Sequence, residues 1–301
     1  MLRLIVLGAA AGGGFPQWNS NGAACRRARA GDTAAIARTQ CSVAASVDDR
    51  SWVLLDAAPD LRAQFQANPA LFPGDAMRSS PLRAVVLTGA DIDKIAGLLT
   101  LREGHPFALF AAPPVLRTLA ANPIFDVLQE GLVTRRGLQM GRAVTPVPGM
   151  QILPFPVPGK VPLYMEAGAD RIDTGEEGDA IGLRIDPGDG RRIFYVPGCA
   201  AVSDGLAARL EGADLVLFDG TLWRDDEMIR MQAGHKTGRR MGHMSIDGPD
   251  GTLAIFSRLK VKRKVLIHVN NTNPVLLADS PERAQVEAAG WEVAYDGMAL
   301  A

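Results

Sequence analysis

The sequence predicts an α/β protein in which two mixed β-sheets pack together with helices on the outside. Three observations support this fold class. Short β-rich runs recur along the 301 residues, and most of them are nearly continuously apolar, as is typical of strands covered on both faces. Helical patterns separate many of these runs. Early runs at 39–47 and 51–58, joined by Asp-Asp-Arg, predict an antiparallel hairpin, which favours two mixed sheets over one doubly wound parallel sheet.

Each expected element has its own sequence signal. The expected strands cover residues 2–8, 39–47, 51–58, 83–88, 107–112, 180–187, 191–198, 214–220, 264–270 and 291–297. The expected helices cover residues 59–68, 91–103, 114–122, 204–212 and 280–290. The helix expected at 280–290 has a clear N-terminal signal, because the hydroxyl of Ser280 can accept a hydrogen bond from a backbone amide that has no partner within the helix, and Pro281 suits the first turn.

The segment 145–180 is rich in Pro, Gly and acidic residues, so it could be a domain boundary or a long loop that crosses one sheet edge. Neither half of the chain alone contains a complete set of candidate site residues, which favours the loop. We therefore expect a single domain over residues 1–301.

Charge and composition limit the function. With 32 basic and 33 acidic residues, the formal net charge is −1, which argues against general attraction to nucleic acid or to an anionic membrane. The apolar run at the N-terminus is too short for a membrane span and lacks the layout of a signal peptide, so we expect a cytoplasmic protein. The three cysteines suggest no disulfide framework.

The candidate site residues follow buried strands, where α/β folds assemble their sites. Asp219 and His268 each end an apolar strand, and Asp91 and Asp93 follow another. An aspartate in such a place can simply shape a turn, but two carboxylates and an imidazole that converge can hold a divalent metal. His243 lies in a loop of the same kind. The glycines at 12–14 have the wrong spacing for a dinucleotide loop, and we expect them to bring backbone close to the site.

These motifs together resemble the pyrroloquinoline quinone (PQQ) biosynthesis protein B family of the metallo-β-lactamase superfamily. The resemblance extends over essentially the whole chain, and its most specific motifs are DGTLWRDDEM at 219–228 and HVNNTNP at 268–274. Further matches are GAAAGGGFPQWN at 8–19, YVPGC at 195–199, KTGRRMGH at 236–243 and SPERA at 280–284. The resemblance implies a four-layer αββα sandwich with the site on loops at one edge.

Lys94 departs from the pattern that the resemblance implies. The superfamily motif HxHxDH would place histidines at 89, 91 and 94, whereas this chain has Gly89, Asp91 and Lys94 and keeps only Asp93. The family usually keeps the Asp-His pair. A protonated lysine has no lone pair for a metal, and nearby carboxylates favour its charged form. We expect the ammonium of Lys94 to replace the cation, paired with Asp93 or Asp219. The rival interpretation is a weakened metal site with Lys94 turned aside.

A second departure concerns a structural zinc. The family commonly has three cysteines in WNCxCxxC, but here Ser20 and Gly22 stand at the first two positions and only Cys25 remains. One thiolate cannot form a tetrahedral zinc site alone, so we expect this zinc to be absent.

The resemblance implies a role in PQQ biosynthesis, with two candidate functions. As an iron-dependent oxygenase, the protein would hydroxylate the tyrosine ring of a peptide-derived Glu-Tyr precursor. Fe(II), or Zn, would then be held by Asp93, Asp219 and His268. The residues expected to act beside the metal or on the substrate are His243, Asn270, Asn271 and Lys94.

As a metal-free carrier of PQQ or its precursor, linked to transport to the periplasm, the protein would use the same pocket. Lys94, Arg62 and Arg239 would then meet the carboxylates of the ligand. Other proteins of the pathway and a second copy of the chain are further expected partners. Classical metallo-hydrolysis ranks last, because the chain lacks the HxHxDH set.

Overall fold

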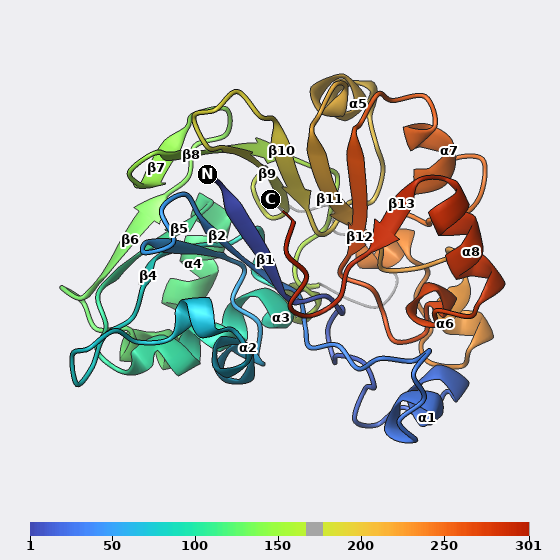
Figure 1. Ribbon diagram of the computed structural model, residues 1–301, viewed down its shortest axis with the longest axis horizontal. Helices are drawn as coiled ribbons and strands as arrows, with labels where there is room; N and C mark the ends of the chain where they lie inside the picture. The colour runs from blue at the N-terminus through green and yellow to red at the C-terminus, as the bar shows by residue number, and fades with distance from the viewer. Residues whose placement is uncertain (167–176, 301) are drawn as a thin grey trace.

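Two β-sheets lie face to face in the computed structural model, which describes residues 1–166 and 177–300 (Figure 1). The first sheet has the order β1-β2-β3-β4-β5-β6. Its strands are β1 (Arg3–Gly8), β2 (Ser42–Ser46), β3 (Trp52–Leu55), β4 (Leu82–Val86), β5 (Phe107–Ala111) and β6 (Val133–Gly137). The first three strands are antiparallel, as the hairpin signal predicts, and β3 to β6 run parallel.

The second sheet has the order β13-β12-β11-β10-β9-β8-β7. Its strands are β7 (Val144–Val147), β8 (Met150–Pro156), β9 (Ile181–Asp186), β10 (Ile193–Val196), β11 (Leu215–Asp219), β12 (Arg263–Ile267) and β13 (Trp291–Val293). The strands from β10 to β13 are parallel, whereas β7, β8, β9 and β10 pair antiparallel. Both sheets are therefore mixed, as predicted.

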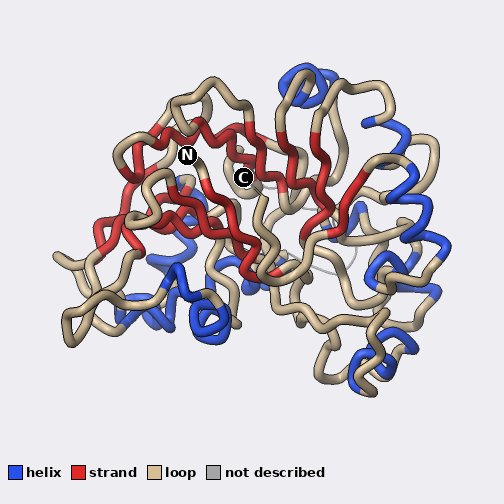
Figure 2. The backbone as a smooth tube through the Cα atoms, viewed as in Figure 1, coloured by secondary structure: helices blue, strands red, loops and turns tan. Residues whose placement is uncertain are grey.

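Helices cover the outer face of each sheet (Figure 2). The α-helices are α1 (Ala23–Arg29), α2 (Leu61–Ala67), α3 (Ile92–Ile95), α4 (Pro113–Ala121), α5 (Asp204–Leu210), α6 (Glu227–Arg230), α7 (Thr252–Phe256) and α8 (Pro281–Ala288). The 3-10 helices are η1 (Pro69–Leu71), η2 (Ala96–Arg102), η3 (Pro123–Val127), η4 (Leu163–Met165), η5 (Arg239–Met241) and η6 (Pro274–Leu276). Apolar residues of α2 and α4 pack on the first sheet, and those of α5, α7 and α8 pack on the second. The four-layer αββα sandwich is confirmed.

A third apolar cluster fills the space between the sheets. It joins inward-facing residues of the first sheet, such as Val53 and Val86, to residues of the second sheet, such as Leu217 and Val265. Because alternate strand residues face opposite sides, half of the side chains of each sheet pack in the layer between the sheets, and the other half pack against the helices on the outer face. This arrangement explains why the strands read as continuous apolar runs.

The segment 145–180 differs from its prediction. Its described part contains most of β7 and all of β8, so it is not simply a loop across a sheet edge. The strand signal is hidden by Pro146, Pro154 and Pro156, because proline lacks the amide that a central strand needs. β7 accommodates its proline at the edge of the sheet, where its pairing with β8 is irregular. In the described residues no helix is both long and apolar enough for a bilayer span.

Candidate functional site

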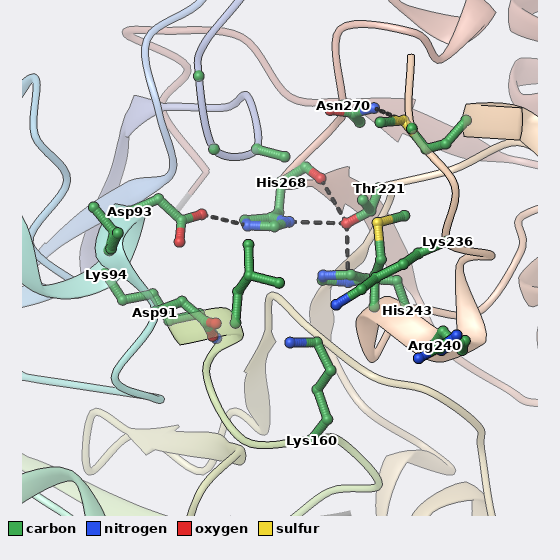
Figure 3. A pocket seen from close by; sticks show the side chains of 18 of the residues that line it. Asp91, Asp93, Lys94, Lys160, Thr221, Lys236, Arg240, His243, His268 and Asn270 are labelled. Carbon is green, nitrogen blue, oxygen red and sulfur yellow. Dashed lines mark hydrogen bonds and ion pairs between the residues drawn. The ribbon is translucent and has the colours of Figure 1, made fainter. Parts of the chain in front are cut away.

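A cavity of about 1010 Å³ opens where the loops after β1, β4, β11 and β12 meet (Figure 3). Segments around η4 and η5 complete its wall. The backbone of Gly12 and Gly13 forms part of the lining, as the sequence predicts for this glycine cluster. A Cβ atom at Gly12 would lie 3.7 Å from the carboxylate of Asp93, which places this glycine in van der Waals range of that side chain.

Asp93 and His268 join the two halves of the sandwich at the cavity. Asp93 lies in α3, just after β4 of the first sheet, and His268 follows β12 of the second. Nε2 of His268 lies 2.8 Å from Oδ2 of Asp93. Burial raises the pKa of Asp93, but the hydrogen bond and the charge of His268 outweigh it and lower that pKa to about 2. Burial also disfavours the charged imidazole, yet Asp93 raises the pKa of His268 above its usual value.

Asp219 is fully buried at the end of β11 and organises the other side of the site. Its Oδ1 accepts hydrogen bonds from the amide and the hydroxyl of Thr221, at 3.0 and 2.6 Å. Its Oδ2 lies 2.7 Å from Nδ1 of His243 and accepts the amide of Cys199 at 2.9 Å. Burial raises the pKa of this carboxyl, but the neighbouring His243 and His268 and the hydrogen bond from the Thr221 hydroxyl lower it below its usual value. Asp219 is thus held as a carboxylate.

The donor set fits a transition metal. Ligand atoms of Asp219, His243 and His268 all lie within 4.8 Å of one another. The two imidazole rings stack with centroids 5.1 Å apart, and Oγ1 of Thr221 contacts Nδ1 of both. Imidazole and carboxylate ligands together suit Zn or Fe(II). Sequence reasoning placed His243 beside the metal, whereas the geometry makes it a possible ligand.

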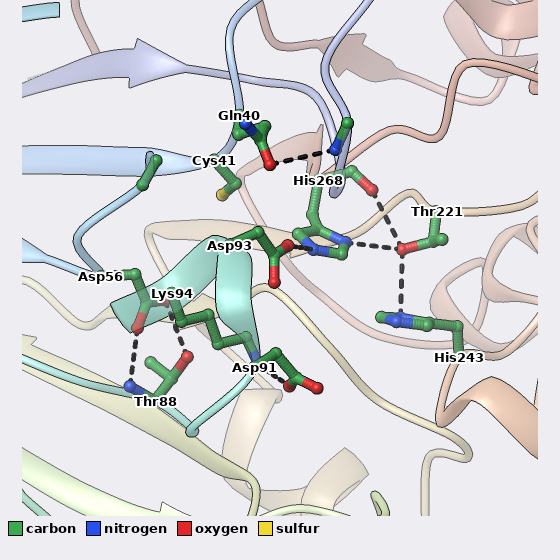
Figure 4. A network of polar contacts seen from close by, with 12 residues as sticks. Gln40, Cys41, Asp56, Thr88, Asp91, Asp93, Lys94, Thr221, His243 and His268 are labelled. Atoms are coloured by element: carbon green, nitrogen blue, oxygen red, sulfur yellow. Dashed lines mark hydrogen bonds and ion pairs between the residues drawn. The ribbon is translucent and has the colours of Figure 1, made fainter. Parts of the chain in front are cut away.

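Lys94 is buried on α3, and its ammonium pairs with a different carboxylate from those predicted (Figure 4). Nζ lies 3.3 Å from Oδ2 of Asp91, and the two groups form an ion pair. The predicted pairing with Asp93 or Asp219 is therefore wrong. The cause is local, because Asp91 lies three residues earlier, on the same side of the short helix.

The charge of Lys94 is stabilised by its surroundings. Burial alone would lower its pKa, but three neighbouring carboxylates, those of Asp91, Asp56 and Asp93, raise the pKa above its usual value. Its Nζ would lie 3.1 Å from a Cβ atom at Gly89, so the missing side chain at that position leaves room for the lysine. Lys94 is thus a charged neighbour of the ligand cluster and offers no lone pair to a metal.

The structure separates the remaining predicted residues. Asn270 lines the cavity. Asn271 does not line it; this residue is buried and donates to Oε1 of Gln17 at 2.6 Å. Arg62 and Arg239, expected to bind carboxylates, are exposed and lie outside the cavity lining.

Three cations that sequence reasoning missed do line the cavity: Lys160, Lys236 and Arg240. Arg240 is next to Arg239 in η5, and successive side chains of such a turn point in different directions. The RR pair in the KTGRRMGH motif was the available signal, but only the fold determines which arginine faces inward. Lys160 lies in the segment that the sequence suggested was a loop.

The residues of the expected zinc motif lie near α1. Cys25 is buried, and its Sγ is 3.7 Å from Oδ1 of Asn271. The hydroxyl of Ser20 accepts the amide of Gly22 at 3.3 Å. The absence of a structural zinc remains a prediction.

Comparison with known proteins defines the class first. The family model described as beta-lactamase superfamily domain matches residues 51–269, more than half of the chain. A diphosphatase of the PhnP family has a TM-score of 0.70 at 21% identity over 99% of this chain and 96% of its own, and this likeness concerns the fold alone. The fold is that of a metallo-β-lactamase-like protein.

Closer relatives identify the family. "Coenzyme PQQ synthesis protein B" of Gluconacetobacter diazotrophicus is 56% identical, covering 100% of this chain and 99% of its own length. The protein of the same name from Xanthomonas oryzae is 53% identical, with both chains fully covered. The crystal structure of Zn(2+)-bound PqqB from Methylobacterium extorquens has a TM-score of 0.96 at 48% identity and full coverage of both chains. The chain belongs to the coenzyme PQQ synthesis protein B family.

Proposed function

We propose that this protein hydroxylates the tyrosine ring of a peptide-derived Glu-Tyr precursor in PQQ biosynthesis, using a metal held at the Asp219, His243 and His268 cluster. The observation that supports this most is that His243 and His268 line a large cavity, and that their ligand atoms and those of the buried Asp219 lie within 4.8 Å of one another. A bound Fe(II) would supply redox chemistry and open positions for oxygen, which the side chains alone cannot provide. Zn(II), the metal bound in the relative from Methylobacterium extorquens, fits the same donors.

The residues of this chain have separate tasks in the proposal. Asp219 orients His243 through the 2.7 Å contact, and Asp93 orients His268 through the 2.8 Å contact. Such partners fix the ring orientation of a ligating histidine and increase its basicity. Asn270 lines the cavity, where its side chain, held by a 2.7 Å hydrogen bond from Nδ2 to Oγ1 of Thr272, contacts the substrate. The exposed side chains of Ile92 and Tyr164 line the cavity and provide apolar contact for an aromatic ring.

The second candidate function is a metal-free carrier of PQQ or its precursor. The observation that favours it is the ammonium of Lys94, which lies beside the ligand cluster in place of the expected histidine. A resident positive charge weakens cation binding and can instead attract an anionic ligand. The carrier uses the same cavity but needs no redox metal.

Metal loading combined with turnover separates the two functions. We would load the purified protein anaerobically with Fe(II), measure its metal content by elemental analysis, and add a Glu-Tyr cross-linked precursor, dioxygen and a reductant. Hydroxylation adds one oxygen atom from dioxygen to the ring, while the other leaves as water with two electrons from the reductant. The enzyme hypothesis predicts about one metal equivalent per chain and a product heavier by one oxygen.

Variants test whether the metal occupies the proposed cluster. Asp219→Ala and His268→Ala should lose the metal and the product, whereas His105→Gln, which alters a histidine outside the cavity lining, should keep both. Lys94→His should increase the metal affinity by adding a lone pair where the charge now lies. Binding of the precursor without metal uptake or product would favour the carrier. Undiminished metal content in both alanine variants would exclude this cluster as the metal site.

A further inference from the structure

A basic wall lies in the cavity beyond the metal-ligand cluster. It consists of Lys160, Lys236 and Arg240, all of which line the same cavity. Figure 3 shows Lys236 and Arg240 near His243, with Lys160 on the adjoining wall. None of the three is a metal ligand, because each is a cation without a lone pair.

Glu166 already shows that this wall accepts a carboxylate. Oε1 of Glu166 lies 2.9 Å from Nζ of Lys160, and Oε2 contacts Nζ of Lys236. The two lysines therefore stand on either side of one carboxylate, with their side chains only 13% and 24% exposed. Partial burial of this kind makes each charge-assisted contact stronger than it would be at a solvated surface.

The guanidinium of Arg240 has an unused hydrogen-bond donor. Its Nη2 is shielded from solvent, and no hydrogen-bond partner for it is found among residues 1–166 and 177–300. A buried guanidinium nitrogen without a partner is costly, and because Arg240 lines the cavity, its guanidinium can turn to donate to an acceptor bound there. Among the described residues, the ion pairs of this wall join one carboxylate, that of Glu166, to two of its three cations, so the wall has an excess of positive charge.

The backbone holds the arginine close to the lysines. Lys236 lies three residues before η5 and Arg240 lies within it, so the two cations come from one short segment. The turn ends at Gly242, which has φ of +85°, and a Cβ atom there would lie 3.2 Å from Cγ of Lys160. Only glycine allows this close approach in the left-handed conformation without strain.

We infer that Lys160, Lys236 and Arg240 form a carboxylate-binding subsite that anchors the acidic end of the ligand while its ring lies toward the metal-ligand cluster. This inference rests on the proposed function for the identity of the ligand, a Glu-Tyr precursor or PQQ. It replaces the predicted roles of Arg62 and Arg239, which lie outside the cavity lining. Guanidinium and ammonium groups give carboxylates charge-assisted hydrogen bonds, which explains the preference for this ligand class.

The test uses PQQ and tricarballylate, a tricarboxylate without a quinone, as probes in isothermal titration calorimetry with the full-length protein. Arg240→Gln should weaken binding of both probes by about ten- to a hundredfold, the effect of losing a charge-assisted hydrogen bond. Arg239→Gln is the matched control, because it removes the same charge one residue away on an exposed side chain. It should leave both affinities nearly unchanged.

A second variant distinguishes loss of the subsite from misfolding of the protein. Glu166→Gln removes the internal competitor for the two lysines, so it should tighten binding of both probes by about threefold to tenfold. A misfolded protein would not bind more tightly. Equal effects of Arg240→Gln and Arg239→Gln, or no binding of tricarballylate by the unaltered protein, would overturn the subsite. Failure of the turnover experiment would leave the tricarballylate result standing, so the subsite and the proposed function can fail separately.

Discussion

Glu227 is a buried acid beside the cavity whose protonation changes near neutral pH. Its Oε2 accepts the amide of Trp223 at 2.6 Å, and its Oε1 accepts the hydroxyl of Thr272 at 2.5 Å. Oγ1 of Thr272 in turn accepts Nδ2 of Asn270, which lines the cavity, at 2.7 Å. Burial raises the pKa of Glu227 to about 7 in spite of these hydrogen bonds. The acid thus supports the position of Asn270.

The raised pKa of Glu227 predicts a pH-dependent stability. The folded protein holds this proton up to about pH 7, whereas the unfolded chain releases it near pH ~4.3, so this contribution is complete at low pH and is lost as the pH rises toward 7. The free energy of unfolding should fall by about 1.4 kcal/mol per pH unit between these values from this group alone. Urea unfolding from pH 5 to 8 should therefore be less pH-dependent in Glu227→Gln than in the unaltered protein. Glu130→Gln, on an exposed side chain, is the control, and identical pH profiles for both variants would contradict the prediction.

At the same scale, the sequence located some site residues and missed others. Asp219 and His268 could be predicted because Asp219 ends an apolar strand and His268 directly follows another, and such strand ends meet at one edge of a sheet. The direction of the Lys94 ammonium could not, because three carboxylates lie within its electrostatic reach and only the fold selects Asp91. Arg240 was missed in favour of its neighbour, because residue spacing does not determine which side of a short turn faces the cavity.

The element that positions Asp93 and Lys94 depends on one close backbone approach. α3 continues into η2, where the amide of Gly97 donates to the carbonyl of Ala57 at 2.8 Å, just after β3. A Cβ atom at Gly97 would lie 2.2 Å from the carbonyl oxygen of Ala58, much closer than real contacts allow. Position 97 therefore requires glycine because the Ala57–Ala58 backbone lies so close, and not because the chain turns there.

Gly97→Ala should therefore displace this element. We expect it to lower the free energy of unfolding by about 1–3 kcal/mol, the usual cost of overpacking, and to weaken metal binding because Asp93 moves. Gly137→Ala is the matched control, since nothing lies within 4 Å of a Cβ atom at that position. Urea unfolding and metal titration of both variants measure the difference. An unchanged stability of Gly97→Ala would show that the two backbone segments can separate freely.

The elements themselves were predicted well where apolar residues run without interruption. All ten expected strands correspond to strands, and the helix expected at 91–103 is divided between α3 and η2. The strands that were missed, β6, β7 and β8, are polar or contain prolines, and pairing with a neighbouring strand stabilises them more than their own sequence does. α6 and α7, which were also missed, have four and five residues, too few for a clear helical period.

Across the whole molecule, one polar network joins the two sheets through the apolar layer. The hydroxyl of Tyr195, in β10, donates to Oδ2 of Asp56 at 3.0 Å, and Asp56 follows β3 of the opposite sheet. Thr88 donates to the same carboxylate through its amide and its hydroxyl, both at 2.7 Å. All three residues are buried, and Asp56 has the left-handed φ of 57°. A buried network of this kind fixes how the sheets face each other.

Tyr195→Phe should weaken this connection. Removing the hydroxyl takes one donor from a buried carboxylate, and we expect a loss of about 1–3 kcal/mol in the free energy of unfolding, measured by urea denaturation. Tyr295→Phe, at a ring that is 49% exposed, should cost much less. If the two variants were equally stable, the Asp56 network would not contribute to the association of the sheets.

The site residues lie on separate segments of the chain, and this affects how such a protein can change during evolution. Asp219 ends β11 and His268 directly follows β12, whereas Lys94 lies on a helix of only four residues. A substitution at position 94 can therefore alter the ligand set without disturbing a strand. Within one lineage, gain or loss of metal chemistry requires no new fold, and ancestors and descendants that differ in this property can share the same architecture.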